Sequence, residues 1–438
     1  MEGRNKRASG SGVVIPDDFE MTPDVERAFG LMEHSRHHLY ITGKAGTGKS
    51  TLLQYFKENS KQNIVVLAPT GVAAINIGGS TIHSFFRFPP RLITPKEVRR
   101  VRGKERLFAS LDTMVIDEVS MVRADVMDAM DHSLRLNRLR PNEAFGGVQM
   151  ICIGDLYQLP PIVEAELQNY LADTYESPYF FDSRVFRENK FEVMELGKVF
   201  RQKDSGFIDL LNKVRNNNLE ESDLRDLNQR CDPSIGFVKG DMAITLTSTN
   251  RRASDINLKH LEALGSKDHT FDAVVTGNYD AQSYPTDERL MLKQGAQVMM
   301  IRNDPAKRWV NGSLGVVQKL SRDSISVSLG DSLCTVESSE WEKVEYEYNK
   351  EDGRIEPKVT GSFKQYPIRL AWAITIHKSQ GKTFDHVIID LGHGAFAHGQ
   401  TYVALSRCRS FEGIRLKTPI RYSDIILDGT VSRFHDGP

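Results

Sequence analysis

A glycine-rich stretch near the start of the chain has the composition and spacing of a phosphate-binding loop. Residues 43–50 read Gly-Lys-Ala-Gly-Thr-Gly-Lys-Ser and fit the pattern G-x-x-x-x-G-K-[ST]. Glycines allow backbone N–H groups to wrap phosphate oxygens, and the N-terminus of a following helix favours negative charge. We expect Lys49 to reach the β- and γ-phosphates of a nucleotide and Ser50 to bind Mg²⁺. The residues expected to line this site are Gly43, Ala45, Gly46, Thr47, Gly48, Lys49, Ser50 and Thr51.

Two adjacent carboxylates, Asp117 and Glu118, end the apolar stretch that starts at Met114. In a nucleotide site Asp117 would hold Mg²⁺ through water, and Glu118 would position and deprotonate the attacking water. Adjacent Asp and Glu residues also cap helices. The pair therefore indicates metal binding and catalysis only in combination with the glycine-rich loop that precedes it.

Three further polar residues are candidates for sensing the terminal phosphate. Gln158 lies in Gly154-Asp-Leu-Tyr-Gln-Leu-Pro-Pro161, where it either contacts the γ-phosphate or belongs to a proline-terminated turn. Arg201 and Arg407 are far apart in sequence, and a single arginine is usually a surface residue. They become arginine fingers only if a second domain faces the first across the nucleotide, which would couple domain closure to hydrolysis.

The elements that must position these residues alternate between short apolar runs and longer helical stretches. A polar or glycine-rich segment follows each of the four predicted strands, which cover 38–42, 64–68, 114–116 and 150–153. In an open α/β sheet, ligands bind at the edge where the carboxyl ends of the strands lie. The sequence therefore predicts an α/β fold with the candidate residues gathered at one sheet edge.

The rest of the chain predicts a second sheet and two insertions. Candidate strands of the second sheet are 193–196, 243–246, 298–301, 387–389 and 414–416. One insertion, 87–106, is rich in Pro, Arg and Lys. The other, 305–366, alternates apolar and polar residues with period two, which is typical of a small antiparallel barrel. The expected organisation is a flexible tail over 1–20, a first domain over 21–190, a second domain over 191–304 and 367–438, and an inserted barrel over 305–366.

Composition excludes several other kinds of protein. The 438 residues are 39% hydrophobic and 26% charged, which is typical of a globular protein. The formal net charge is −1, so any nucleic acid must be held by a local groove. No apolar run reaches the roughly 18 residues of a membrane span. No C-x-x-C pair occurs, which argues against a zinc site or a disulfide framework and indicates a reducing compartment; the cysteines are Cys152, Cys231, Cys334 and Cys408.

Seven short motifs, taken in order along the chain, resemble those of superfamily-one helicases. They are Ala68-Pro-Thr-Gly-Val-Ala-Ala74, Ser80-Thr-Ile-His-Ser-Phe85, Asp117-Glu-Val-Ser-Met-Val122, Gly154-Asp-Leu-Tyr-Gln-Leu-Pro-Pro161, Phe200-Arg-Gln202, Thr375-Ile-His-Lys-Ser-Gln-Gly381 and Tyr402-Val-Ala-Leu-Ser-Arg407. Together they closely resemble the PIF-type (petite integration frequency) DNA helicases, which are relatives of the RecD and Dda helicases. The resemblance runs from about Thr22 to Leu416, which is nearly the whole chain.

This resemblance implies a fold, an activity and a set of site residues. The implied fold has two RecA-like P-loop domains in tandem, with a strand-separating wedge at 87–106 and an SH3-like β-barrel inserted in the second domain. Members use ATP and Mg²⁺, translocate 5′ to 3′ on single-stranded DNA, and unwind duplexes, forks and often G-quadruplexes. Roles in DNA repair, recombination and telomere maintenance come with the same resemblance. The implied catalytic residues are Lys49, Asp117, Glu118, Gln158, Arg201 and Arg407, with Gly381 as a further nucleotide contact and Ser50 and Asp117 as metal ligands.

A path for single-stranded DNA also follows from the matched motifs. Hydroxyls, backbone amides and lysine can hold phosphates, while histidine and phenylalanine can stack on bases. The expected DNA-binding residues are Thr70, Gly71, His83 and Phe85 in the first domain and Thr249, Asn250, Thr375, His377 and Lys378 in the second. Core packing remains the alternative for Phe85, and a structural role remains the alternative for each histidine. The basic residues of the wedge insertion either face incoming duplex or form an ordinary solvated surface.

The chain departs from the family pattern at one position that bears on specificity. Relatives often carry a glutamine before the P-loop that recognises adenine, and this chain has Val25 there. Selectivity for ATP over other nucleotides is therefore less secure. The sequence starts close to its helicase core and is similar to the compact bacterial or phage form. With no targeting segment, a monomer in the cytoplasm is the expectation.

Two other functions stay open on the sequence. An RNA or RNA–DNA hybrid helicase would use a similar groove, because phosphate contacts discriminate sugars weakly and only 2′-OH contacts distinguish them. An ATP-dependent DNA clamp or remodeller would bind DNA without separating strands. Stimulation of ATP hydrolysis by DNA or by RNA, and strand displacement itself, distinguish these possibilities.

Overall fold

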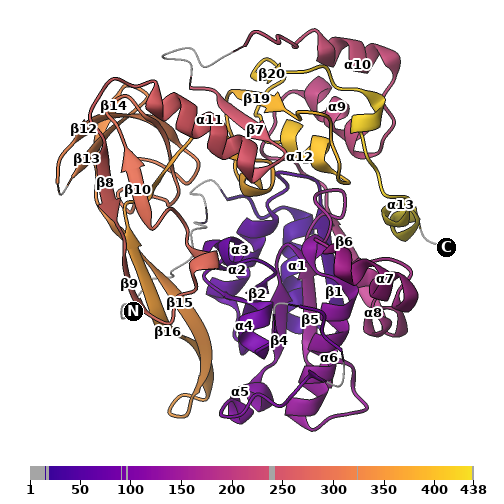
Figure 1. Cartoon of the computed structure of the whole chain (residues 1–438). Coiled ribbons are helices and arrows are strands. Elements are labelled where there is room, and N and C mark those ends of the chain that lie inside the picture. The colour runs from indigo at the N-terminus through magenta and orange to yellow at the C-terminus, as the bar shows by residue number, and fades with distance from the viewer. Residues whose placement is uncertain are drawn as a thin grey trace.

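The computed structural model describes residues 15, 19–89, 91–94, 97–235, 242–322 and 324–436. The flexible tail expected over 1–20 lies almost entirely outside the described residues. The described chain forms two parallel β-sheets flanked by helices, with an antiparallel β unit inserted in the second half (Figure 1). This arrangement is the α/β fold that the sequence predicts.

The first sheet has six parallel strands in the order β3-β2-β4-β5-β1-β6. Its strands are β1 (His38–Gly43), β2 (Ile64–Ala68), β3 (Ser80–Thr81), β4 (Thr113–Ile116), β5 (Gln149–Ile153) and β6 (Phe191–Leu196). The strand β6 corrects the expected boundary, because it was assigned to the second domain. It pairs with β1 along its whole length, and the first domain therefore extends past residue 190.

Helices on both faces cover this sheet. They are α1 (Pro23–His34), α2 (Lys49–Asn59), α3 (Gly71–Asn76), α4 (Ile82–Phe86), α5 (Glu105–Ser110), α6 (Ala124–Arg138), α7 (Ala165–Thr174) and α8 (Arg184–Glu188), with short 3₁₀ turns η2 (Val119–Met121), η3 (Ala144–Gly147) and η4 (Phe180–Asp182). The helix α1 illustrates how the sequence sets a helix start. The hydroxyl of Thr22 accepts from the Val25 N–H, and a proline follows at the first helical position.

The second sheet has four parallel strands in the order β18-β7-β19-β20. These are β7 (Ile244–Thr247), β18 (Ala373–Thr375), β19 (Val387–Asp390) and β20 (Ile414–Leu416). The associated helices are α9 (Ser205–Arg215), α10 (Glu221–Asn228), α11 (Asn250–Glu262) and α12 (Gln400–Leu405). Three of its strands were predicted from their apolar runs, and the two parallel sheets form a tandem pair of α/β domains.

An antiparallel unit is inserted between α11 and β18. Its main sheet has the order β14-β13-β12-β11-β17, formed by β11 (Gln297–Met300), β12 (Leu314–Leu320), β13 (Ile325–Leu329), β14 (Ser332–Val336) and β17 (Ile368–Leu370). The strand β11 corrects a second expectation, since 298–301 was assigned to the second parallel sheet. Buried apolar residues of β11 pack with Trp309 and Val317, so the insertion begins well before residue 305.

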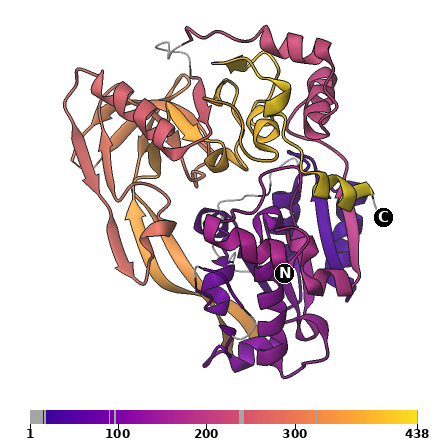
Figure 2. The same ribbon diagram turned by 45° about the vertical axis from the view of Figure 1, so that its right-hand side comes forward.

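A long hairpin extends from this insertion toward the first domain (Figures 1 and 2). It consists of β15 (Ser339–Asn349) and β16 (Arg354–Gln365), and β9 (Val274–Gly277) pairs with β16. Two strands, β8 (His269–Asp272) and β10 (Arg289–Leu292), pair separately, and η5 (Ala281–Ser283) lies between β9 and β10. The Tyr346 hydroxyl hydrogen-bonds both the N–H and the carbonyl of Val66, each at 3.2 Å. The hairpin therefore covers backbone of β2 that the two-residue strand β3 leaves unpaired.

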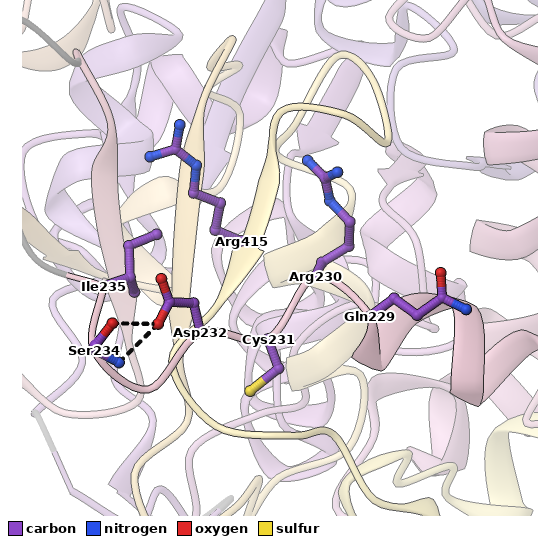
Figure 3. Close-up of a pocket in the computed structure, with 7 residues that line it drawn as sticks. All are labelled: Gln229, Arg230, Cys231, Asp232, Ser234, Ile235 and Arg415. Carbon is purple, nitrogen blue, oxygen red and sulfur yellow. Dashed lines mark hydrogen bonds between the residues drawn. The ribbon is translucent and has the colours of Figure 1, made fainter.

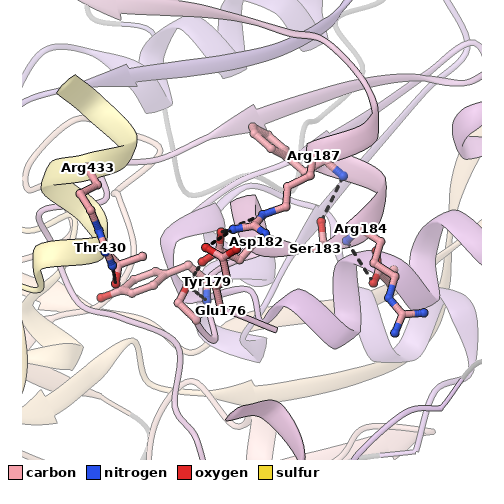
Figure 4. A network of polar contacts seen from close by, with 11 residues as sticks. Glu176, Tyr179, Asp182, Ser183, Arg184, Arg187, Thr430 and Arg433 are labelled. Atoms are coloured by element: carbon pink, nitrogen blue, oxygen red, sulfur yellow. Dashed lines mark hydrogen bonds and ion pairs between the residues drawn. The ribbon is translucent and has the colours of Figure 1, made fainter. Parts of the chain in front are cut away.

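The end of the described chain returns to the first domain. After η7 (Tyr422–Asp424), helix α13 (Gly429–Asp436) places the Phe434 ring in a stack with Phe181 at 4.4 Å. Figure 4 shows Thr430 and Arg433 of this helix beside the polar network of Arg187 and Asp182, whose ion pair measures 2.8 Å. Residues expected to complete the second domain thus pack on the first, and α13 ties the two domains together.

The described residues of 87–106 are largely irregular before α5 begins at Glu105. Apolar side chains anchor it in the core of the first domain: Phe88, Ile93, Val98 and Val101. The arginines at 99, 100, 102 and 106 are exposed, and Lys96 lies outside the described residues. The ammonium of Lys104 pairs with Glu345 of the hairpin at 2.9 Å. The basic run is therefore a solvated face that also touches the inserted unit.

Among the residues with a described placement, no helix combines the length and the apolarity that crossing a membrane requires.

Candidate active site

The glycine-rich loop connects β1 to α2 and has the backbone shape of a phosphate cradle. Gly46 and Gly48 have φ angles of +84° and +85°, in the left-handed region that favours glycine. A side chain at Gly46 would also collide with Arg201, because its Cβ would lie 2.5 Å from the Arg201 Cβ. The N–H of Phe200 donates to the Gly46 carbonyl at 2.8 Å. The loop is thus pressed against the segment that carries Arg201.

Lys49 starts α2 and folds back over the loop. Its ammonium donates to the carbonyl of Lys44 at 3.0 Å and to the carbonyl of Gly43. Burial lowers the pKa of Lys49, while the charges of Asp155 and Glu118 oppose the shift. These neutral carbonyl partners hold the charged group close to the cradle without neutralising it. Ser50 follows at the exposed start of the helix and Thr51 in its first turn.

Asp117 and Glu118 directly follow β4, at the carboxyl edge of the first sheet. Burial raises the pKa of Asp117, and the neighbouring charge of Glu118 adds to the shift. Burial also raises the pKa of Glu118, while Lys49 and Arg407 oppose it. Glu118 has a φ of +51°, which turns the chain sharply at this point. Both carboxylates therefore lie in the electrostatic reach of Lys49, and Glu118 also lies in that of an arginine from the second domain.

A magnesium ion fits this arrangement as a companion of the nucleotide. Among the described residues, no group of three or more His, Cys, Asp or Glu side chains is arranged to hold a metal by itself. Mg²⁺ is usually bound by one or two carboxylates, waters and substrate phosphates. The buried Asp117 carboxylate and the exposed Ser50 supply that kind of partial set.

Arg407 follows α12 and is almost completely buried, at 1% exposure. Its guanidinium donates to the carbonyl of Val403 at 2.9 Å, to that of Ser379 at 3.4 Å and to the Ser406 hydroxyl at 2.8 Å. Burial lowers the pKa of Arg407 to about 9, and the charge of Arg201 contributes in the same direction. Its polar partners in these contacts are uncharged. The charges of Glu118 and Asp155 act on Arg407 without a direct ion pair, so an anion here could bond the guanidinium directly.

Arg201 reaches the same place from the segment after β6. It donates to the Ser406 carbonyl at 3.2 Å, and the amide of Gln202 donates to the carbonyls of Ser406 and Cys408 at 3.1 and 2.9 Å. Burial lowers the pKa of Arg201 to about 10. The structure therefore brings both expected arginines together within electrostatic reach of Glu118, although they are far apart in sequence.

Gln158 lies in the loop after β5, and its amide donates to the Asp155 carboxylate at 3.2 Å. Asp155 pairs with Arg215 of α9 at 3.3 Å, and both side chains are buried. Burial opposes ionisation of Asp155, but Arg215 and Lys49 outweigh it and lower its pKa. The guanidinium of Arg215 also lies 3.7 Å from the centre of the Tyr157 ring. The Gln158 loop is therefore fixed by a helix of the second domain.

Two residues that were not predicted as site residues, Tyr402 and His398, form hydrogen bonds between the two domains here. The Tyr402 hydroxyl accepts from the backbone N–H of Ala45 at 3.0 Å. The Nε2 atom of His398 lies 2.7 Å from the Leu156 carbonyl, while its Nδ1 accepts from the Asp428 N–H at 3.0 Å. These contacts require a neutral imidazole, and burial lowers the pKa of His398 accordingly. Tyr402 was inside a recognised motif, but its partner could only be seen in the fold.

Phe200 is a third residue without an expected role. Its ring is 43% exposed, although it stands beside buried residues of the loop. A Cβ on Gly48 would lie 3.8 Å from this ring, and the Lys198 ammonium lies 5.2 Å from its centre. An exposed aromatic face next to a phosphate cradle is suited to stacking on a nucleotide base. Gly381, expected as a nucleotide contact, is exposed with open space around its α-carbon.

The expected DNA residues of the first domain lie beyond the end of β2. The Thr70 hydroxyl caps α3 by accepting from the Ala73 N–H at 3.2 Å. Gly71 is covered by the inserted unit, since a Cβ there would lie 2.6 Å from the Ser283 hydroxyl. His83 is partly buried on α4, and burial lowers its pKa. Of these candidates, Gly71 therefore lies beneath η5.

Phe85 was expected to bind DNA, but the structure buries it in the core of the first domain. Its side chain is 1% exposed and packs against Phe86, Phe108 and Tyr346. A ring inside this aromatic cluster cannot stack on a base without leaving the core. The alternative of core packing, which the sequence left open, describes Phe85 in the structure.

The expected DNA residues of the second domain lie at or after the ends of β7 and β18, as those of the first domain lie after the end of β2. Thr249 caps α11 by accepting from the Arg252 N–H at 3.4 Å, and both Thr249 and Asn250 are exposed. The Thr375 hydroxyl accepts from the Lys378 N–H at 3.3 Å at the start of η6 (His377–Ser379). Lys378 is exposed, and burial lowers the pKa of the partly buried His377.

A separate hollow of about 500 Å³ lies beside β20 (Figure 3). It is lined by Gln229, Arg230, Cys231, Asp232, Ser234, Ile235 and Arg415. The Asp232 carboxylate already accepts from the N–H and hydroxyl of Ser234, at 2.9 and 2.6 Å. No residue of the glycine-rich loop lines the hollow, so it is not part of the candidate active site.

Comparisons with known proteins agree on one family. Residues 25–225 match the PIF1-like helicase family. The ATP-dependent DNA helicase Pif1 of Bdellovibrio bacteriovorus is 30% identical over 419 residues, which cover 93% of this chain and 90% of that protein. The human ATP-dependent DNA helicase PIF1 is 36% identical over 393 residues, which cover 86% of this chain. The match spans 58% of the length of the human protein.

Solved structures show the same relationship. Pif1 from Bacteroides sp in complex with ADP-AlF4 is 37% identical, with a TM-score of 0.88 over 96% of this chain and 97% of that one. The structure of Bacteroides Pif1 bound to ssDNA has the same identity and coverage but a TM-score of 0.70. These matches extend over both parallel sheets and identify them as two RecA-like domains. The chain belongs to the PIF1-like helicase family.

Proposed function

We propose that this protein is an ATP-dependent DNA helicase that moves 5′ to 3′ on single-stranded DNA and unwinds duplex, forked and G-quadruplex DNA. The observation that carries the proposal is a cluster of charged groups contributed by both domains. Lys49 and Glu118 of the first RecA-like domain lie there with Arg201 and Arg407, and Arg407 comes from the second domain. A site divided between two domains can convert nucleotide turnover into domain movement. Relatives named as ATP-dependent DNA helicases support the same activity.

The proposed roles follow the chemistry of each side chain. Lys49 leaves its carbonyl partners to bind the β- and γ-phosphates, while the N–H groups of the loop hold the phosphate chain. Glu118 accepts a proton from the attacking water, which Gln158 helps to orient. Arg201 and Arg407 stabilise charge on the transferring group. The remaining nucleotide contacts are Gly43, Ala45, Gly46, Thr47, Gly48, Thr51 and Gly381.

Mg²⁺ belongs with this site as the partner of ATP. Ser50 and Asp117 are the residues that would hold it, directly or through water. When bound, the ion neutralises charge on the β- and γ-phosphates. The buried position of Asp117 keeps its carboxylate away from competing bulk water.

We further propose that Phe200 is the platform for the nucleotide base. Its exposed ring stands beside Gly48, whereas Val25 is buried in α1 at 4% exposure and offers no polar group to a base. Aromatic stacking is tolerant of base identity because every base has a π-face. Weak discrimination between ATP and GTP is therefore part of the proposal.

Strand binding is proposed to use equivalent groups of the two domains. Thr70 follows β2 and caps α3, while Thr249 follows β7 and caps α11. Each hydroxyl oxygen accepts a backbone N–H, which leaves its O–H able to donate to a phosphate. Asn250, Thr375, His377 and Lys378 extend this surface in the second domain, and Gly71 and His83 do so in the first. Alternating grip by the two domains would then move the strand.

The inserted unit must move for the first domain to contact DNA. Ser283 covers Gly71, and Tyr346 of the hairpin is bonded to Val66. The relative from Bacteroides supports such a movement, since the TM-score falls from 0.88 without DNA to 0.70 with ssDNA at the same identity. We propose that the insertion, an SH3-like barrel by family resemblance, swings away from α3 when the strand enters.

The exposed arginines of 87–106 complete the proposal as a wedge. The segment is anchored by apolar residues and presents Arg99, Arg100, Arg102 and Arg106 outward. Such a face can contact the phosphates of incoming duplex. The protein is proposed to act as a monomer.

The test is ATP hydrolysis with matched single-stranded DNA and RNA, in the wild type and in Lys49→Ala. We expect DNA to stimulate hydrolysis more strongly than RNA, and Lys49→Ala to lose hydrolysis while retaining most DNA binding. Stimulation by RNA alone would replace the DNA assignment with an RNA helicase. Normal hydrolysis by Lys49→Ala would contradict the assignment of the site.

A further inference from the structure

Three cationic side chains lie close together beside η6. Only one of them, Lys378, belongs to the proposed strand contacts. Arg369 lies on β17, Lys378 lies in η6, and Lys382 follows η6 by three residues. The strand β18, which ends at Thr375, runs between them in sequence. The charge of Arg369 acts on both lysines and lowers the pKa of each, after the larger effect of burial. The geometry agrees: Lys382 bonds Asn311, the next residue Gly312 donates to the Met300 carbonyl of β11, and β11 pairs with β17, which carries Arg369.

The hydrogen-bond partners of this cluster are neutral. The Lys382 ammonium donates to the Asn311 side-chain carbonyl at 2.6 Å, and the Arg369 guanidinium donates to the Pro285 carbonyl at 2.8 Å. Within the described part of the chain, no carboxylate forms an ion pair with Arg369, Lys378 or Lys382. The carboxylate whose charge reaches Arg369 and Lys378 is that of the exposed Asp287.

Holding these cations together is unfavourable in the protein alone. Arg369 and Lys382 are partly buried, so water screens their repulsion less than at the open surface. Burial, followed by the charge of Arg369, lowers the pKa of Lys382 to about 8. An uncharged side chain could make the same hydrogen bonds to Asn311 and Pro285. The hydrogen bonds therefore do not require positive charges at these positions. A bound anion would account for them.

A loop of the inserted unit forms one wall of the cluster. The Asn311 N–H donates to the Asn303 side chain at 2.7 Å, which fixes the loop. The next residue, Gly312, has a φ of +101°, and a Cβ there would lie 3.8 Å from the Lys382 Cβ. Lys382 is thus held between the second RecA-like domain and the insertion.

We propose that Arg369 and Lys382, together with Lys378, form a phosphate-binding site that takes a phosphodiester of the DNA strand. The inference rests on the proposed function, and it extends the strand path from Thr375 and Lys378 onto the boundary with the insertion. Lys378 connects the two, because it belongs both to the expected DNA surface and to the cluster. A phosphate in this place makes charge-assisted hydrogen bonds with arginine and lysine and relieves their repulsion.

The test neutralises each charge while keeping a hydrogen-bond donor. Lys382→Gln can still donate to Asn311, and Arg369→Gln can still donate to Pro285. The controls are Lys319→Gln and Arg322→Gln, which change exposed residues of the same inserted unit. Binding of an oligo-dT strand is measured from about 50 to about 300 mM salt, together with the melting temperature of each protein.

We expect each test variant to bind oligo-dT several-fold more weakly at low salt. Each strand phosphate that a variant no longer neutralises should reduce the slope of log affinity against log salt by about 0.7. The melting temperature should stay unchanged or rise, because repulsion is removed. The control variants should match the wild type in affinity and in salt slope.

Several results would overturn the inference, each in a recognisable way. Wild-type affinity and slope in both test variants would exclude the DNA contact. A lower melting temperature with unchanged binding would assign the cations a structural role. If inorganic phosphate stabilised the wild type but not the variants, while oligo-dT binding stayed equal, the site would take free phosphate instead. A wild-type protein that bound no oligo-dT would contradict the proposed function itself.

Discussion

The hydroxyl of Tyr402 accepts a hydrogen bond from the backbone N–H of Ala45 at 3.0 Å, although 357 residues separate the two in sequence. Ala45 belongs to the phosphate-binding loop, and Tyr402 belongs to α12, the helix that leads into Arg407. The contact joins the loop that would hold the nucleotide to the segment that carries Arg407, the proposed arginine finger. A change in the loop can therefore reach the second RecA-like domain through a single short helix.

This relationship predicts the effect of Tyr402→Phe. Removing the hydroxyl leaves the Ala45 N–H without its partner, and one neutral hydrogen bond contributes about 0.5–1.5 kcal/mol. We expect kcat/KM for ATP to fall by about two- to tenfold, while affinity for single-stranded DNA is retained. The matched control is Tyr422→Phe, which changes a half-exposed tyrosine of the same half of the chain. Equal kinetics in both variants would show that the contact is not used in turnover.

Glu118→Gln tests the proposed base. The amide cannot accept the proton of the attacking water, but it preserves the size of the side chain at a position whose φ of +51° already constrains the backbone. We expect ATP binding to persist and turnover to fall by about 10²–10⁴-fold. Nucleotide affinity and steady-state hydrolysis measured on the same preparation separate the two effects. Turnover near the wild-type rate would remove Glu118 from the role of base.

The docked hairpin leads to a prediction of a gain rather than a loss: a variant that should bind single-stranded DNA more tightly. Tyr346→Phe removes both hydrogen bonds to Val66, and these bonds favour the form in which Ser283 covers Gly71. Because a competing docked form reduces apparent affinity, we expect single-stranded DNA to bind roughly three- to tenfold more tightly. Tyr348→Phe, two residues along the same strand, is the control. Weaker or unchanged binding by Tyr346→Phe would mean that docking does not compete with DNA.

The histidine at the start of β1 predicts a pH dependence of stability. Burial lowers the pKa of His38 from its usual value of 6.5 to about 4, and its Nδ1 accepts from the Met150 N–H. The folded protein therefore binds fewer protons here than the unfolded chain, and stability is lost as pH falls from about 6.5 to about 4. His38→Gln keeps an acceptor but does not titrate. Melting temperatures across this range should fall less steeply in His38→Gln than in the wild type or in the exposed variant His132→Gln.

The positions of the residues expected to bind the nucleotide were predictable because their signals are local. Gly46 and Lys49 belong to the turn from β1 into α2, Asp117 directly follows β4, and the carboxyl ends of parallel strands share one sheet edge. Arg201 and Arg407 were recognised from their motifs rather than from their own residue types. The structure then brings them together, since α12 and the segment after β6 meet over the loop.

The incorrect and missed assignments have a common physical cause. A local sequence pattern does not show which distant segment a strand or side chain will contact. The apolar runs of β6 and β11 predict strands, but nothing in either run says which sheet it joins. Phe85 is apolar and follows a loop, and only the surrounding rings show that it is core. His398 escaped notice because its partners, Leu156 and Asp428, come from distant segments.

The central claim is that ATP turnover between the two RecA-like domains drives strand separation with a fixed direction. The most direct measurement is ATP-dependent unwinding of two partial DNA duplexes, one with a 5′ single-stranded tail and one with a 3′ tail, with Lys49→Ala as the inactive control. We predict that the wild type unwinds only the 5′-tailed duplex and that Lys49→Ala unwinds neither. Unwinding of only the 3′-tailed duplex would contradict the proposed direction. DNA-stimulated hydrolysis without any unwinding would contradict the helicase and favour an ATP-dependent clamp or remodeller.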